Sequence, residues 1–251
     1  MKIFRMVLTA AAVAGLCVLW SAAPGITASG DPWEDQEYTA WSKKDAEKVL
    51  SNSPWARRVA TKTDMVKESE DYKAQGGAPK SGTEAVDRGT MREGDFATVV
   101  WWSAKSPRRA YVRQLQHAGQ NLAPETIQQF LDQPLAHHVL TLRVEGGDLV
   151  KTSAKLTPED LKQGAWLETS RLKKIAADEA AVVNGADGKP DRLRFHFPKE
   201  MNGAPTVTSE DKRVLFRFKL PRRQGENLKN AEQFEVSFEV KKMAARSEAD
   251  F

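Results

Sequence analysis

The chain has 251 residues, of which 29% are charged, and a formal net charge of +4. Because the charges are of mixed sign and close to balance, the composition does not favour nucleic-acid binding. The hydrophobic content of 40% is slightly low and fits a globular protein with long polar loops.

Residues 1–28 have the pattern of a secretory signal peptide. Lys2 and Arg5 precede an almost wholly apolar run, and small residues follow up to Ala28. The run is short for a membrane span, and Pro24 follows it closely. We therefore expect cleavage after Ala28, a mature net charge of 4 − 2 = +2, and a periplasmic or secreted bacterial protein with no stable membrane span after signal removal. Retention of the segment as an uncleaved anchor is the alternative.

Cys17 is the only cysteine, and it lies inside the signal segment. Cleavage would therefore leave a mature chain without a disulfide, a thiol nucleophile or a thiolate metal ligand. A lipid-modified cysteine normally follows a small residue, whereas Leu16 precedes Cys17. The sequence therefore does not favour a lipoprotein.

The N-terminal helical segment is expected at residues 29–66, with a short amphipathic helix flanked by Trp41 and Trp55. Ser42 and Asp45 have the spacing of a capping box at the start of this helix. Its apolar face follows the i, i+3, i+4 spacing: Ala46, Val49 and Leu50. We predict that both flanking tryptophans pack in the core, with exposed ligand platforms as the alternative.

An α+β domain is expected at residues 95–245, after a flexible loop or linker at 67–94 that is rich in charged residues, serine and glycine. The β-branched and aromatic run 96–103 predicts a strand. Neighbouring strand residues point to opposite faces, so Trp101 and Trp102 should lie on different sides of the sheet. A helix covering one of them is the favoured interpretation, and a binding surface is the alternative.

The middle of the chain predicts two helices, at 106–118 and 123–133, followed by a strand at 139–144. This order allows a crossover between parallel strands, although two helices also permit other returns. The next segments are predicted to be a short capped helix at 157–161 and a strand at 166–172. The segment 175–183 is ambiguous between helix and strand.

The C-terminal part has the clearest pattern, because apolar and polar residues alternate along three runs: 192–197, 213–220 and 233–240. Period two predicts antiparallel strands with one buried face. Pairing Arg217 with Glu235 sets the register expected for the last two strands. It also forms these pairs: Arg213 with Glu239, Phe216 with Val236, and Phe218 with Phe234. The expected fold class is α+β, largely antiparallel sheet in the C-terminal half with a few short helices packed on it.

The sequence contains no motif typical of a catalytic or metal site. The four histidines lack the spacing of zinc ligands: His117, His137, His138 and His196. A Gly-x-Ser-x-Gly elbow and a phosphate-binding loop are also missing. Arg108 and Arg109 have the chemistry to hold an anion, but a solvated helix start is the favoured interpretation. We therefore predict no catalytic residues, no metal and no cofactor.

Three stretches of the sequence resemble uncharacterised secreted proteins of soil bacteria. The first runs from Trp41 to Ala46 and continues with Val49-Leu50 and Ser53-Pro54-Trp55. The others are 100–104 and the C-terminal strand ending at 238–243. The resemblance covers most of the mature chain and implies no activity and no site residues.

The sequence favours an exported, non-enzymatic protein that binds a partner protein or an envelope component. The candidate binding residues are Trp33, Trp101 and Trp102. The alternative is an exported hydrolase whose site is assembled from distant residues. A binding module should show an exposed apolar patch near these tryptophans, whereas a hydrolase should show a cleft with converging carboxylates or histidines.

Overall fold

The computed structural model describes these residues: 30–60, 96–145, 155–185, 187–221, 224–245 and 248–251. The predicted signal peptide and the predicted loop at 67–94 lie outside the described residues. Within the described ranges, no helix combines the length and the apolar composition needed to cross a membrane.

The fold is α+β, as predicted, and its described strands form two main antiparallel sheets. Sheet A contains, in spatial order, β1 (Ala56–Ala60), β2 (Phe96–Trp101), β3 (His137–Glu145), β7 (Pro190–Pro198) and β6 (Glu179–Asn184). Sheet B contains β11 (Glu232–Phe238), β10 (Val214–Leu220), β4 (Ala165–Glu168) and β5 (Ile175–Ala176). Two short ladders pair β8 (Glu200–Met201) with β9 (Ala204–Pro205), and β12 (Ala244–Ala245) with β13 (Glu248–Ala249).

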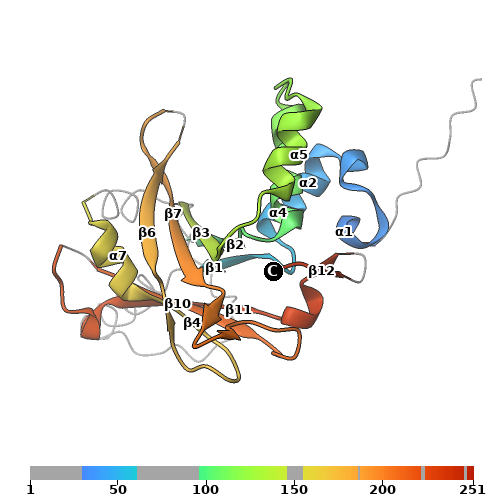
Figure 1. Cartoon of the computed structure of the whole chain (residues 1–251). Helices are drawn as coiled ribbons and strands as arrows, with labels where there is room; N and C mark the ends of the chain where they lie inside the picture. Colours follow the sequence, from blue (N-terminus) through green and yellow to red (C-terminus); the bar gives the residue numbers. More distant parts are fainter. Residues whose placement is uncertain (1–29, 61–95, 146–154, 186, 222–223, 246–247) are drawn as a thin grey trace, which may run out of the picture.

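The idea of a parallel crossover between β2 and β3 is wrong. The two strands are direct antiparallel neighbours, with Val99 opposite Leu142. The two intervening helices pack beside the end of the sheet, so the chain returns next to β2 in the opposite direction (Figure 1). The ambiguous segment 175–183 forms strands β5 and β6 rather than a helix.

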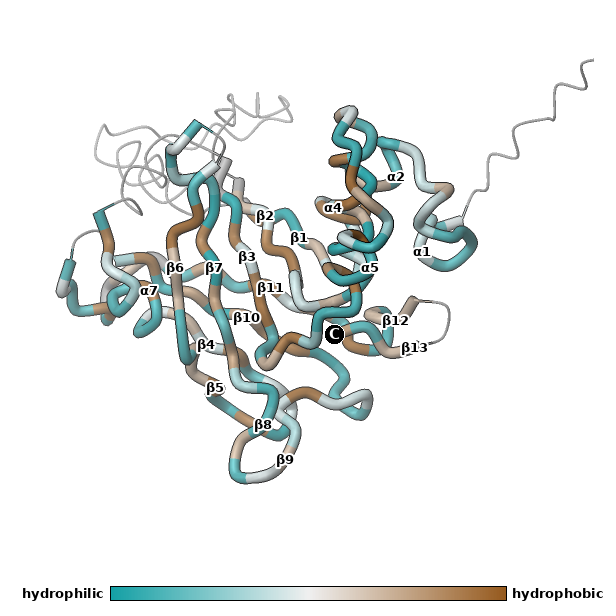
Figure 2. The backbone as a smooth tube through the Cα atoms, turned by 45° about the horizontal axis from the view of Figure 1, so that its top comes forward, coloured by the Kyte–Doolittle hydropathy of each residue, from teal (hydrophilic) through white to brown (hydrophobic). Residues whose placement is uncertain are grey.

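The hydrophobic core lies between the two sheets. Phe195 of sheet A has its ring centroid 4.9 Å from that of Phe218 and 5.5 Å from that of Phe216, both in sheet B. The strands of sheet B run across those of sheet A in Figure 1. Figure 2 shows hydrophobic segments along β2 and β3, in the middle of sheet A. The alternating pattern of the sequence therefore gives each sheet one face for this shared core.

Most helices gather at one end of sheet A, and α7 (Pro158–Gly164) lies at the other end (Figure 1). The gathered helices are α1 (Pro32–Asp35), α2 (Lys43–Ser51), α4 (Lys105–His117) and α5 (Pro124–Asp132). The described residues also contain short 3-10 helices: η1 (Tyr38–Ala40), η2 (Leu228–Asn230) and η3 (Val240–Lys242).

Helix α2 has the predicted capping box. The Ser42 Oγ accepts a hydrogen bond from the Asp45 amide at 3.2 Å, and the Asp45 Oδ2 accepts one from the Ser42 amide at 2.9 Å. Trp41 and Trp55 are 2% and 0% exposed, which confirms that both flanking tryptophans are core residues.

Helix α4 receives its N-terminal cap from a distant part of the chain. Its N-cap residue, Ala104, has no side-chain acceptor. Instead, the amides of Lys105 and Ser106 donate to the two carboxylate oxygens of Asp250, at 2.5 and 2.8 Å. The Asp250 carbonyl also accepts a hydrogen bond of 2.6 Å from the Trp55 indole nitrogen. Asp250 therefore ties α4 to the beginning of β1.

The predicted register of β10 and β11 is confirmed within the ladder. Arg217 lies opposite Glu235, Phe216 opposite Val236 and Phe218 opposite Phe234. The ladder ends at the pair of Val214 and Phe238, so Arg213 and Glu239 fall outside it. Glu239 forms an ion pair with Lys242 instead, at 2.9 Å.

Candidate functional site

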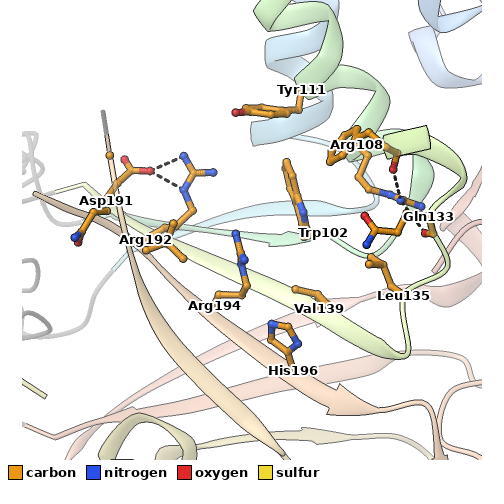
Figure 3. A pocket seen from close by; sticks show the side chains of 14 residues that line it. Trp102, Arg108, Tyr111, Gln133, Leu135, Val139, Asp191, Arg192, Arg194 and His196 are labelled. Atoms are coloured by element: carbon orange, nitrogen blue, oxygen red, sulfur yellow. Dashed lines mark hydrogen bonds and ion pairs between the residues drawn. The ribbon is translucent and has the colours of Figure 1, made fainter. Parts of the chain in front are cut away.

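Trp101 and Trp102 point to opposite faces of sheet A, as the strand pattern predicts. Trp101, the last residue of β2, is 0% exposed and packs against the rings of His138 and Phe238 at 5.3 and 5.4 Å. Trp102 is half-buried on the other face, where it lines a cavity of about 560 Å³ (Figure 3). We call this the Trp102 cavity. Its volume lies within the range of small-molecule binding sites.

An aromatic wall forms one part of the Trp102 cavity. The ring of Tyr111, on α4, meets the ring of Trp102 edge-on, with centroids 5.4 Å apart. Phe130, on α5, continues the wall at 6.4 Å from Tyr111. The wall thus joins the end of β2 to the two helices beside the sheet.

Strand β7 supplies a basic and polar part of the same cavity. Arg192, Arg194 and His196 point away from the core, and the alternate residues of the strand are buried in it: Leu193, Phe195 and Phe197. Figure 3 shows Arg192 and Arg194 beyond one face of the Trp102 indole, and Arg108 on its other side.

The charges of this cavity are unequally paired. Asp191 accepts a hydrogen bond of 2.6 Å from the Arg192 Nε and lies 3.2 Å from the Arg143 Nε. By contrast, the Arg194 Nε is buried and has no hydrogen-bond partner among the described residues. Figure 3 likewise draws no interaction between Arg194 and the other lining residues. Because one carboxylate faces several guanidinium groups, the cavity carries a net positive charge.

Arg108 also lines the cavity, and its environment differs from the predicted solvated helix start. Its side chain is held by the carbonyl oxygens of Phe130 and Gln133, at 2.9 and 3.3 Å, and the residue is 5% exposed. Burial lowers the pKa of Arg108, and this effect is opposed by the charges of Asp250 and Asp132. Its Nε has no partner among the described residues. The neighbouring Arg109 is half-buried, 5.6 Å from the ring of Tyr38.

The histidines divide between the two faces of sheet A. Burial, with smaller contributions from His137 and Arg194, lowers the pKa of His196, although Glu179 opposes the change. His196 is therefore mainly neutral at pH 7 and can both donate and accept a hydrogen bond. His138 is 3% exposed on the core side, and burial lowers its pKa to about 3.

Trp33, the third candidate tryptophan, lies elsewhere. It is 4% exposed and packs edge-on against Trp55, with ring centroids 5.8 Å apart. It borders a separate, polar cavity of about 650 Å³ beside Lys241 and Lys242. The structure therefore brings neither Trp33 nor Trp101 to the Trp102 cavity.

The acidic and metal-ligating groups of the site can be stated for the described residues. In the part of the chain that the structure describes, no group of three or more histidine, cysteine, aspartate or glutamate residues is arranged to hold a metal ion. Asp191 is the only carboxylate among the described residues lining the Trp102 cavity, and it is engaged with two arginines.

The sequence pattern does not single out the basic part of the site. The alternation marks Arg192, Arg194 and His196 only as the polar side of an amphipathic strand. The available signal was that this side carries consecutive cationic or ionisable residues with few carboxylates between them.

No family model, curated protein or solved structure matches this chain.

Proposed function

We propose that this chain is an exported, non-enzymatic protein that binds a partner or a component of the cell envelope, and that the Trp102 cavity is its binding site. One observation carries the proposal. A half-buried tryptophan in an aromatic wall faces a buried arginine nitrogen without a hydrogen-bond partner among the described residues, across a cavity of about 560 Å³. A small number of well-placed polar groups in a cavity lined by aromatic residues is typical of binding sites.

The hydrolase alternative rests on His196 and Asp191, which line the same cavity. A hydrolytic site needs a base that is free to take a proton from water or from a nucleophile. Asp191 is bound by Arg192 and Arg143, and no serine, threonine or cysteine nucleophile is among the described residues that line the cavity with His196. This arrangement supports binding better than hydrolysis.

The test is capture of envelope material by the mature protein and by two variants. Trp102→Ala should lose the captured component, whereas Trp166→Ala should retain it. Trp166 is a matched control because it is also half-buried, but it lies on β4 of sheet B beside Lys174. Equal capture by Trp102→Ala and the wild type would contradict the proposed site. Labelling by a serine-directed fluorophosphonate that is lost on denaturation would favour the hydrolase.

A further inference from the structure

We propose that the ligand of the Trp102 cavity is an anionic saccharide, whose pyranose ring lies against Trp102 and whose carboxylate or phosphate pairs with Arg194. This inference rests on the proposed function and adds the chemical class of the ligand. It follows from the different bonding states of the arginines around the cavity, from the aromatic wall, and from the polar groups that complete the lining.

Arg194 is the arginine that is available to an anion. Arg192 is already paired with Asp191, at 2.6 Å. Arg108 donates to the carbonyls of Phe130 and Gln133, although its Nε also has no partner among the described residues. The Arg194 Nε is buried and has no partner among the described residues. A buried donor without a partner destabilises the unliganded protein, and an incoming acceptor removes that cost.

The guanidinium group selects for a planar or tetrahedral oxyanion. Its N–H groups form a fixed fork that matches the oxygens of a carboxylate or a phosphate, and such charge-assisted hydrogen bonds are stronger than neutral ones. Arg192 and Arg108 add positive potential near this position, and Asp191 offsets only part of it. A cationic ligand would meet repulsion at the same place.

The aromatic wall indicates a ring with C–H groups on one face. The Trp102 indole presents a face toward Arg192 and Arg194 in Figure 3, and Tyr111 packs against the indole edge-on at 5.4 Å. Tyr111 thereby fixes the orientation of the indole. Such a fixed face can bury the apolar side of a pyranose ring while the hydroxyl groups of the sugar remain at its edge.

The remaining lining supplies partners for hydroxyl groups. Gln133 and Asn184 contribute amide side chains, and His196 is mainly neutral at pH 7 because burial lowers its pKa. Amides and neutral imidazole each offer both a donor and an acceptor, which is the pattern that a hydroxyl group requires. A purely hydrocarbon ligand would leave these groups without partners.

The experiment compares three sugars that share one ring and differ at carbon 6. Glucuronic acid carries a carboxylate there, glucose 6-phosphate a phosphate, and glucose a neutral hydroxymethyl group. We expect calorimetric titration of the mature protein to give a dissociation constant about tenfold lower for at least one anionic sugar than for glucose, which is the effect of one charge-assisted hydrogen bond. The preferred anionic sugar distinguishes carboxylate from phosphate recognition.

Two variants identify the groups responsible. Arg194→Gln should remove the preference for the charged sugars, and Trp102→Ala should weaken binding of all three. Arg217→Gln is the matched control, because Arg217 lies on sheet B and already faces Glu235 and Glu168, at 3.0 and 3.7 Å. It should leave all three affinities unchanged. Equal affinities for the three sugars, no binding of any of them, or a preference that survives in Arg194→Gln would overturn the inference.

The inference and the proposed function fail in different ways. If envelope capture depends on Trp102 but glucuronic acid and glucose 6-phosphate do not compete with it, the site stands and the saccharide assignment is wrong. If capture does not depend on Trp102, the site itself is wrong, and the assignment falls with it.

Discussion

The two faces of sheet A use the same alternating strands for opposite purposes. The inner face is mainly apolar, and sheet B covers it through contacts of Phe216 and Phe218 with Phe195. The outer face presents Trp102 and Arg194 to a cavity. Adjacent residues of one strand therefore differ in their surroundings: the inner side chain of Trp101 packs in the core between the two sheets, whereas the outer side chain of Trp102 lines a cavity.

Replacing the two adjacent tryptophans would test this comparison most strongly. Trp101→Ala should lower the free energy of unfolding by about 3–5 kcal/mol, because the residue is 0% exposed and its removal leaves a cavity. Trp102→Ala should cost less than about 1 kcal/mol, because its ring is only half-buried at the cavity wall. Chemical denaturation measures both values. Similar losses for the two variants would show that the outer face is as tightly packed as the inner one.

Measuring stability as a function of pH would sharpen the comparison of the two faces at His138, which lies on the inner face. Its pKa falls from 6.5 to about 3 on folding, mainly through burial, with smaller effects of Lys199 and His137. Between these values the unfolded state binds a proton that the native state excludes, so stability is complete above pH 6.5 and decreases as the pH falls toward 3. We expect a loss of up to about 4 kcal/mol over this interval.

The control for His138 is His138→Leu, which removes the titrating group but keeps an apolar side chain. Denaturant midpoints measured from pH 7 to pH 4 should decline less steeply for this variant than for the wild type. Parallel pH profiles would mean that other groups cause the acid sensitivity.

Removing the cap of α4 would disturb the outer face without touching its lining. Asp250→Ala deletes the acceptor of the Lys105 and Ser106 amides, and should cost about 0.5–2 kcal/mol, the usual effect of losing a helix cap. Asp250→Asn keeps one acceptor oxygen and should lose less. Thermal unfolding of the two variants provides the measurement, and an unchanged midpoint for Asp250→Ala would show that water replaces the carboxylate without cost.

The smallest expected effect comes from comparing an arginine on the outer face of each sheet. On sheet B, Arg217 lies between Glu235 and Glu168, whereas on sheet A the Nε of Arg194 has no partner among the described residues. The Arg217 Nε is 3.0 Å from the Glu235 carboxylate but does not make a well-aligned hydrogen bond with it. A double-mutant cycle with Arg217→Ala and Glu235→Ala should give a coupling of about 0.2–1 kcal/mol. A coupling of zero would mean that the buried phenylalanines alone set the register.

Features that depend on neighbouring residues could be predicted from the sequence. The capping box of α2 follows from Ser42 and Asp45, which are three residues apart, and the β10–β11 register follows from matching two nearby alternating runs. The antiparallel return of β3 beside β2 could not be predicted, because helix packing rather than local pattern decides it.

The candidate site was predictable only in part. The period of two indicates that Trp101 and Trp102 point to opposite faces of the sheet, but it does not show which of them enters the core. That choice depends on the distant Phe238, which packs against Trp101. The meeting of Arg194 with Trp102 also required the order of strands in sheet A, in which β3 separates β2 from β7. No local pattern contains this information.

The link between Asp250 and α4 has a consequence for the order in which the protein folds. Synthesis proceeds from the N-terminus, and the amide of Lys105 precedes its acceptor on Asp250 by 145 residues. Trp55 precedes the same residue by 195 positions. Contacts of such long separation form slowly, because a large loop must close before they contribute. We therefore expect the helical end of the protein, and with it the part of the Trp102 cavity wall on α4, to become rigid last.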